Sequence, residues 1–212
     1  MSLNLYLLRH GQTELSRADV FCGSGLDPDL TSDGREMAAA FAKSYQTTHW
    51  SGIFTSELRR TISTAQPLAE TLKIAPEARA GLNEIGYGEW EGLGRETVDA
   101  KYHDDYVNWL ADPAWNAPTK GELALEVARR ALQVVEEIQR RCDGNVLMVS
   151  HKATIRIMLC SLLGIDVGRF RYRFVCPVGS VTVVEFAAHG PSLSIFADRS
   201  HLSERLRSLP GT

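Results

Sequence analysis

Two apolar runs, one at the start of the chain and one in its last third, each end at a histidine. Arg9, His10 and Gly11 follow the first run directly, and His151 follows the second run after one serine. A histidine nitrogen can act as a nucleophile, and a guanidinium presents a fork of donors that fits phosphate oxygens. Glycine lets the backbone approach an anion closely. Taken alone, the first segment fits a phosphate site and a loop that merely holds two cations equally well.

Two further segments supply residues of matching chemistry from distant parts of the sequence. The segment 56–65 places two adjacent arginines at the expected start of a helix, where helix-end amides and a guanidinium could bind phosphate together. The segment 82–92 places Glu84 in a loop rich in aromatic residues and glycine. Side chains at the carboxyl ends of strands in an open α/β sheet face the crevice where ligands bind. Both histidines are expected at such strand ends.

Strands and helices alternate along most of the chain. Short apolar runs predict strands, and apolar residues at helical spacing predict helices; the strands are expected at about 3–8, 52–55, 145–150, 181–186 and 193–196, and the main helices at about 33–46, 56–69, 97–110, 122–141 and 153–163. This order predicts an α/β fold, a three-layer α/β/α sandwich with a mostly parallel sheet. We expect one domain over residues 1–212, with 86–121 as a short lid insertion and 199–212 as a charged surface tail.

The order of these motifs resembles the histidine phosphatase superfamily, the phosphoglycerate mutase-like proteins, over about residues 3–186. The resemblance implies a phosphoglycerate mutase-like fold and a reaction in which His10 becomes phosphorylated. It also implies that Arg9, Arg59 and His151 hold the phosphoryl oxygens. Of the two adjacent arginines, we take a Ser-x-Leu-x-Arg pattern to select Arg59, and expect its neighbour Arg60 to be solvated.

The resemblance makes Glu84 the general acid that protonates the leaving alkoxide. Apolar residues surround it in the sequence, and if they also do so in space, burial would favour its protonated form. After phosphoryl transfer the same carboxylate could activate the water that hydrolyses phosphohistidine. Glu89 and Glu91 are nearby acids that we expect to be exposed in the loop. The implied mechanism requires no metal and no organic cofactor.

Two departures from the family pattern concern the substrate. Where many members have Trp-Asn, this chain has Leu-Ser, so a polar phosphate contact would fall to Ser16 or be lost. Lys152 follows the second histidine, where glycine is common. Either its long stem carries the charge into water, or it contacts a second anionic group of the substrate. Sugar phosphates, phosphoglycerates, phosphoserine and nucleotide-like monoesters all remain possible substrates.

Three functions fit these residues. The favoured one is a phosphatase that hydrolyses a small phosphorylated metabolite through phosphohistidine. The alternatives are a phosphoglycerate mutase, which returns the phosphoryl group to substrate, and a non-catalytic phosphate-binding regulatory protein. Glu84 and His151 lie 67 positions apart, and the resemblance implies a longer insertion there in mutases, which shields the phosphoenzyme from water. A shorter lid favours hydrolysis.

The composition limits which binding partners and which cellular compartment we expect. The 212 residues carry a net charge of −3 and are 44% hydrophobic, so neither nucleic acid nor an acidic membrane surface is an expected partner. The expected partner is a small phosphorylated molecule, with a homodimer as a possibility. Four widely spaced cysteines predict free thiols in a reducing cytoplasm. The apolar start is too short for a signal peptide and no run is long enough for a membrane span, so we expect a cytoplasmic protein.

Overall fold

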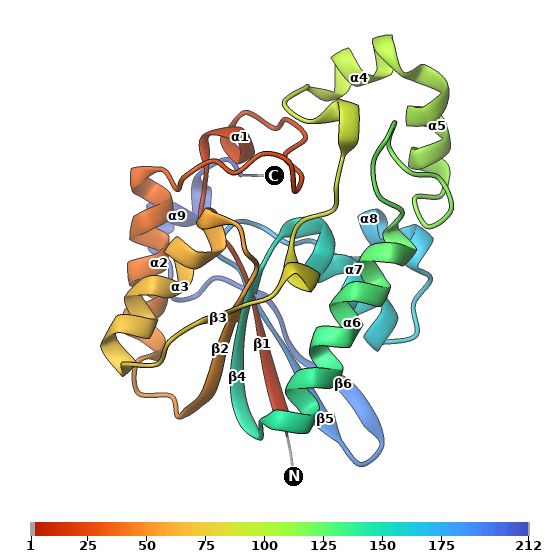
Figure 1. Cartoon of the computed structure of the whole chain (residues 1–212). Helices are drawn as coiled ribbons and strands as arrows, with labels where there is room; N and C mark the ends of the chain where they lie inside the picture. The colour runs from red at the N-terminus through yellow and green to blue at the C-terminus, as the bar shows by residue number, and fades with distance from the viewer. Residues whose placement is uncertain (1–2, 212) are drawn as a thin grey trace.

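A six-stranded sheet forms the centre of the protein, as the computed structural model of residues 3–211 shows (Figure 1). Its spatial order is β3-β2-β4-β1-β5-β6. Strands β1 to β4 pair in parallel, and the last two strands pair antiparallel at one edge. The mostly parallel sheet predicted from the sequence is confirmed. The strands are β1 (Leu3–Arg9), β2 (Trp50–Thr55), β3 (Glu77–Ala78), β4 (Gly144–Ser150), β5 (Val181–Ala187) and β6 (Gly190–Asp198).

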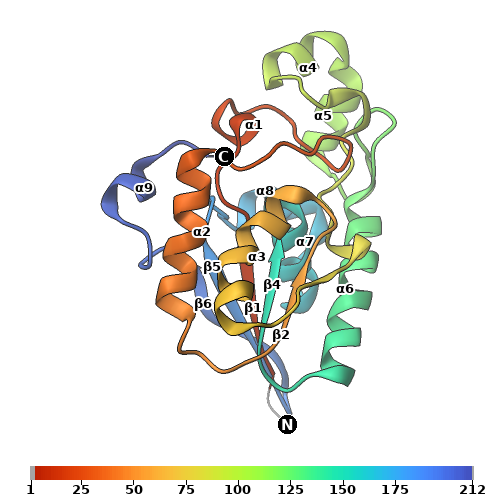
Figure 2. The same ribbon diagram turned by 60° about the vertical axis from the view of Figure 1, so that its left-hand side comes forward.

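Helices cover both faces of the sheet, which gives the expected three layers (Figures 1 and 2). Side chains alternate between the faces of β1, so Leu5 and Leu7 pack with α6 and α7, whereas Leu8 packs with α2 and α3. No helix among residues 3–211 combines the length and apolar character needed to cross a membrane. The helices are α1 (Glu14–Arg17), α2 (Ser32–Tyr45), α3 (Arg59–Leu72), α4 (Arg95–Lys101), α5 (His103–Ala111), α6 (Ala124–Arg141), α7 (Lys152–Leu162), α8 (Phe170–Arg173) and α9 (Glu204–Ser208).

The pairing of β1 with β4 explains why the two histidines meet. The strands run parallel in a register that places Arg9 opposite Ser150, the last residue of each strand. The next residue of each chain segment is therefore a histidine at the same edge of the sheet. The backbone N–H of His10 donates to the carbonyl oxygen of Ser150 at 3.0 Å, which fixes this arrangement.

The segment 86–121 lies above the carboxyl edge of the sheet and carries α4 and α5 (Figure 1). Trp90, Val98, Tyr106 and Trp109 form a small apolar cluster of their own. The single helix expected over 97–110 is instead two helices, because Tyr102 adopts a non-helical conformation, with φ −131° and ψ 39°. The segment is therefore a packed subdomain over the edge where both histidines lie.

The description of 199–212 as a surface tail is wrong for the part that the structure describes. Leu202 and Leu206 are buried against Met37 of α2 and Val178. Beyond α9 the backbone returns to the carboxyl edge of the sheet, where the side-chain amide of Gln12 donates to a main-chain carbonyl of this segment at 2.6 Å. The charged residues around them hid this apolar pair in the sequence, because Leu202 precedes α9 and only Leu206 lies within it.

Candidate active site

His10 is buried at the end of β1 and holds a defined tautomer. Its Nδ1 lies 2.8 Å from the carbonyl oxygen of Gly11, and because a carbonyl can only accept, Nδ1 carries the hydrogen. Nε2 is then unprotonated. Burial, with the nearby guanidinium groups of Arg60 and Arg9, lowers the pKa of His10 well below its ordinary value of 6.5. At neutral pH the ring is thus neutral, the form that can attack phosphorus.

His151 lies beside His10, with 5.2 Å between the ring centroids. Arg60 donates from Nε to Nδ1 of His151 at 3.1 Å. Because Nδ1 accepts, Nε2 carries the hydrogen and donates to Oγ of Ser56 at 2.8 Å. Burial and the charge of Arg60 lower the pKa of His151 well below 6.5. The ring of His151 is therefore neutral and hydrogen-bonded at both nitrogens.

The structure corrects the choice between the two arginines of α3. The side chain of Arg59 is 61% exposed and pairs with Asp27 and Asp29 on the surface. The side chain of Arg60 is 1% exposed and points at His151. Successive helix residues project about 100° apart, so only one of two neighbours can face the sheet edge. Counted from Ser56, the Ser-x-Leu-x-Arg pattern ends on Arg60, so our assignment was one residue short.

Arg9 is buried, and backbone carbonyls hold its guanidinium group. Its Nη1 donates to the carbonyl oxygen of Cys176 at 2.6 Å and to that of Gly211 at 3.3 Å. Burial lowers the pKa of Arg9, although a guanidinium stays charged at neutral pH. The group lies on the wall of the same cavity as His10. It is therefore a fixed cation next to the proposed nucleophile.

Glu84 is buried, and hydrogen-bond donors surround its carboxyl group. Its Oε1 accepts from the backbone N–H groups of Ile85 and Thr154, at 2.9 and 3.1 Å, and from the Thr154 hydroxyl at 3.0 Å. Its Oε2 accepts from the backbone N–H of Ala153 at 3.1 Å. The carboxyl group thus caps the positive end of α7. Oε2, with one donor, keeps room for a transferred proton.

Gly11 has a packing role in the structure, whereas the predicted phosphate contact of Ser16 is not tested by it. The backbone N–H of Gly11 donates to Thr64, and a Cβ on Gly11 would lie 2.5 Å from the carbonyl oxygen of Gly34. Close packing against α2 therefore explains this glycine, whereas we expected room for an anion. Ser16 lines the cavity, but its hydroxyl accepts from the backbone N–H of Thr13 in a capping box and donates to the Thr13 carbonyl oxygen. A phosphate contact by Ser16 stays a prediction.

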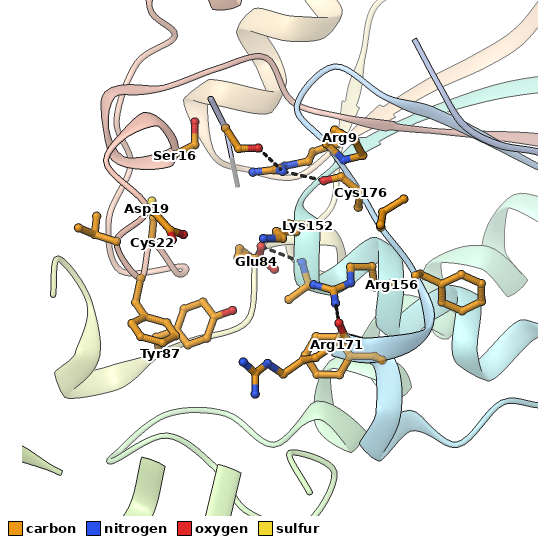
Figure 3. Close-up of a pocket in the computed structure, with 18 of the residues that line it drawn as sticks. Arg9, Ser16, Asp19, Cys22, Glu84, Tyr87, Lys152, Arg156, Arg171 and Cys176 are labelled. Carbon is orange, nitrogen blue, oxygen red and sulfur yellow. Dashed lines mark hydrogen bonds between the residues drawn. The ribbon is translucent and has the colours of Figure 1, made fainter. Parts of the chain in front are cut away.

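A cavity of about 480 Å³ opens between the sheet edge and the segment 86–121. In Figure 3, Arg9, Lys152, Arg156 and Arg171 project from one side, and Ser16, Asp19, Cys22 and Tyr87 from the other. The volume suits a small-molecule ligand. His10 and Glu84 also line this cavity, whereas His151 and Arg60 lie fully buried behind it.

Sequence reasoning missed two cations of this cavity. Arg156 lies one helical turn after Lys152 on α7, and this i, i+4 spacing could have indicated that the two share a face. Arg171 comes from the short helix α8, for which the sequence offered no comparable signal. As for a metal, residues 3–211 contain no cluster of three or more histidine, cysteine or acidic side chains suited to hold one.

Fold and site together define an α/β protein with two buried histidines at the edge of a cavity lined with cations. Comparison with known proteins gives the family. The family model for the histidine phosphatase superfamily (branch 1) matches residues 5–199. Phosphoserine phosphatase 1 of Hydrogenobacter thermophilus is 32% identical over 183 residues, covering 86% of this chain and 86% of that protein. Glucosyl-3-phosphoglycerate phosphatase of Mycolicibacterium vanbaalenii is 32% identical over 87% of this chain and 84% of its own length.

A solved structure agrees with these sequence relatives. Bacillus stearothermophilus YhfR superposes with a TM-score of 0.87 at 26% identity, covering 94% of this chain and 98% of that one. The chain belongs to the histidine phosphatase superfamily. The resemblance drawn from its motifs is therefore confirmed, and so is the phosphatase class predicted from it.

Proposed function

We propose that this phosphatase hydrolyses small phosphomonoesters through a phosphohistidine at His10. The observation that carries this proposal is the buried, neutral ring of His10, with Nε2 unprotonated and with Arg9, Arg60 and His151 around it. A phosphate dianion repels nucleophiles, so fixed cations must neutralise it first. Two buried guanidinium groups supply that charge beside the ring.

The first step forms a bond between Nε2 of His10 and phosphorus and breaks the bond from phosphorus to the leaving oxygen. The leaving alkoxide takes one proton from Glu84, whose Oε2 accepts a single hydrogen bond. In the second step the Glu84 carboxylate takes a proton from water while the water oxygen bonds to phosphorus. The bond from phosphorus to nitrogen then breaks, which releases inorganic phosphate and restores both side chains.

Glu84 suits the second step better than the first. The donors around its oxygens match a carboxylate, which is the form that accepts a proton from water. The acid role needs one proton on Oε2 when substrate is bound.

The mutase remains the alternative to test. A mutase must keep water from the phosphoenzyme, and the cavity of this chain opens to solvent beneath a short insertion. With 3-phosphoglycerate and its bisphosphorylated partner supplied, inorganic phosphate should appear faster than 2-phosphoglycerate. Rapid exchange of the isomers with little phosphate release would establish the mutase.

The proposal also covers the kind of substrate and the cellular compartment, each supported by its own observation. The relatives are named for phosphoserine and for glucosyl-3-phosphoglycerate, and a cavity of about 480 Å³ could hold a phosphorylated metabolite of either kind. The four cysteines are unpaired in the part of the chain that the structure describes, which supports a reducing, cytoplasmic location. A homodimer stays a prediction.

A further inference from the structure

The cavity wall carries more positive charge than one phosphoryl group requires. Arg9 and Arg60 lie next to His10, where the phosphoryl group would be transferred. Lys152 and Arg156, one turn apart on α7, and Arg171 on α8 line the same cavity beyond that point. Their place on the wall of this cavity calls for a separate explanation.

Arg156 is buried, and one of its hydrogen-bond donors has no partner within the described residues. It is 8% exposed, and its Nε has no hydrogen-bond partner among residues 3–211. One terminal nitrogen donates to the carbonyl oxygen of Arg171, and the guanidinium carbon lies 5.3 Å from the centre of the Phe170 ring. A buried donor without a partner costs free energy. A ligand acceptor in the cavity would remove that cost.

Arg171 carries a second such donor and reaches the lid segment. Its Nη1 is buried and also lacks a partner in the described part of the chain. Its guanidinium carbon lies 4.0 Å from the ring centre of Trp109, a residue of α5. This stacking fixes the plane of the guanidinium group against the insertion. The group is thus held in place, with a donor to spare.

Acidic side chains do not balance this cluster. Within residues 3–211 no salt bridge involves Lys152, Arg156 or Arg171. Asp19 lies on the cavity wall, pairs with Arg95 at 3.3 Å and offsets only part of the charge around Lys152. Glu84 accepts hydrogen bonds from the N-terminus of α7. Burial, together with the charges of Arg9 and Arg156, lowers the pKa of Lys152 to about 8. Three clustered cations with only one carboxylate near Lys152 among residues 3–211, that of Asp19, are unfavourable unless an anion binds there.

We propose that Lys152, Arg156 and Arg171 form a subsite for a second oxyanion, a carboxylate or a phosphate, on the part of the substrate that leaves. This inference rests on the proposed hydrolase function and narrows its substrates to phosphomonoesters that carry a further negative charge. Tyr87 and Trp109 line the same space and would contact the carbon skeleton between the two anions. The subsite takes no part in the bonds that form and break at His10.

The test compares substrates that differ in one charge. D-3-Phosphoglycerate carries a carboxylate, glycerol 3-phosphate lacks it, and glycerol 1,3-bisphosphate replaces it with a phosphate. In the native protein, kcat/KM for the better of the two doubly anionic substrates should exceed that for glycerol 3-phosphate at least tenfold. Whichever of the two wins identifies the group that is recognised. A ratio near one for both would overturn the proposal.

Variants then connect the preference to these side chains. Arg171→Met removes the guanidinium group with its charge and keeps an unbranched apolar side chain beside Trp109, and Lys152→Gly restores the common family residue. Each should lower the ratio at least tenfold, mainly through KM. The matched control is Arg173→Met, at an exposed position of the same helix and away from the cavity, which should keep the native ratio. An unchanged ratio in both cavity variants would overturn the subsite.

A binding measurement separates this proposal from the proposed function. Calorimetric titration of the His10→Ala variant with D-3-phosphoglycerate and glycerol 3-phosphate needs no turnover. Tighter binding of the former, lost when Arg171→Met is added, supports the subsite even if no phosphohistidine forms. Equal binding of both compounds overturns it even if the enzyme hydrolyses p-nitrophenyl phosphate. If Arg171→Met does not fold, Lys152→Gly gives the same comparison from α7.

Discussion

The guanidinium group of Arg60 donates from Nε to Nδ1 of His151 at 3.1 Å, and both side chains are almost fully buried. This bond fixes the tautomer of His151 and directs its Nε2–H to Ser56. The other guanidinium nitrogens of Arg60 donate to the carbonyl oxygens of Gly23 and Leu26. One arginine thus ties the loop after α1 to the histidine pair.

The first prediction separates the two adjacent arginines. Arg60→Ala removes a cation beside His10 and leaves Nδ1 of His151 without its donor, so kcat/KM should fall by about 10²–10³. Arg59→Ala removes only exposed ion pairs, worth little in general, and serves as the control with kcat/KM within about twofold. Circular dichroism checks that both variants fold. Equal losses in the two variants would contradict the placement of Arg60.

The second prediction concerns the protonation of His10. Since burial and two guanidinium groups lower its pKa well below 6.5, the ring should be neutral at pH 7, with the hydrogen on Nδ1. Nitrogen-15 NMR of histidine-labelled protein, with His10→Ala to assign the signal, reports both facts. Protonation should begin only as the pH falls well below 6.5. An imidazolium signal from His10 at pH 7 would contradict the assigned nucleophile.

The third prediction tests Glu84 as proton donor. Glu84→Gln keeps the shape but turns an amide N–H₂ toward backbone N–H groups of α7, so we expect a loss of stability of about 1–3 kcal/mol. Hydrolysis of alkyl phosphates should slow much more than that of p-nitrophenyl phosphate, whose leaving group hardly needs a proton. Glu89→Gln is the control, because Glu89 pairs with Lys120 at the surface. Equal slowing of both substrates would remove the acid role from Glu84.

The fourth prediction uses the lowered pKa of Lys152. Below about pH 8 the ammonium is charged and should bind a second anion, and above it the charge is lost. The ratio of kcat/KM for D-3-phosphoglycerate to that for glycerol 3-phosphate should therefore fall as the pH rises from 7.5 to 9.5, a range in which both phosphates are fully ionised. Arg9, Arg156, Asp19 and the Cys176 thiol face Lys152, and burial raises the pKa of that thiol.

Lys152→Gly supplies the control for that profile. Without the lysine the ratio should be low and independent of pH between 7.5 and 9.5. If the ratio of the two kcat/KM values stays constant across this range in the native protein, Lys152 does not bind the second anionic group of the substrate. A step that survives in Lys152→Gly would assign the titration to another group.

The sheet and the histidine pair could be predicted because local signals determined them. Two apolar runs that each end at a histidine are visible in the sequence, and parallel pairing brings the strand ends together. The environment of Glu84 could not be predicted, because Ala153 and Thr154, which supply three of its four donors, lie about seventy residues away. Sequence neighbours were a poor guide to spatial neighbours there.

The remaining differences have two causes. The choice of Arg59 was an error in counting the motif from Ser56, and the burial of Arg60 corrects it. Arg171 is held by a tertiary contact with Trp109, and the segment after residue 199 is held by contacts with α2. Neither contact produces a periodic apolar pattern in these short, charged stretches of sequence. Such segments are where sequence patterns carry least information.

The central claim is that His10 becomes covalently phosphorylated during turnover. The most direct test is to quench a reaction with ³²P-labelled substrate in alkali during the steady state and to locate the label by peptide mapping. We predict an acid-labile, alkali-stable label on the peptide that contains His10, and no label in the His10→Ala variant, which should also lose turnover. Label on another residue, or near-normal turnover by His10→Ala, would contradict the account.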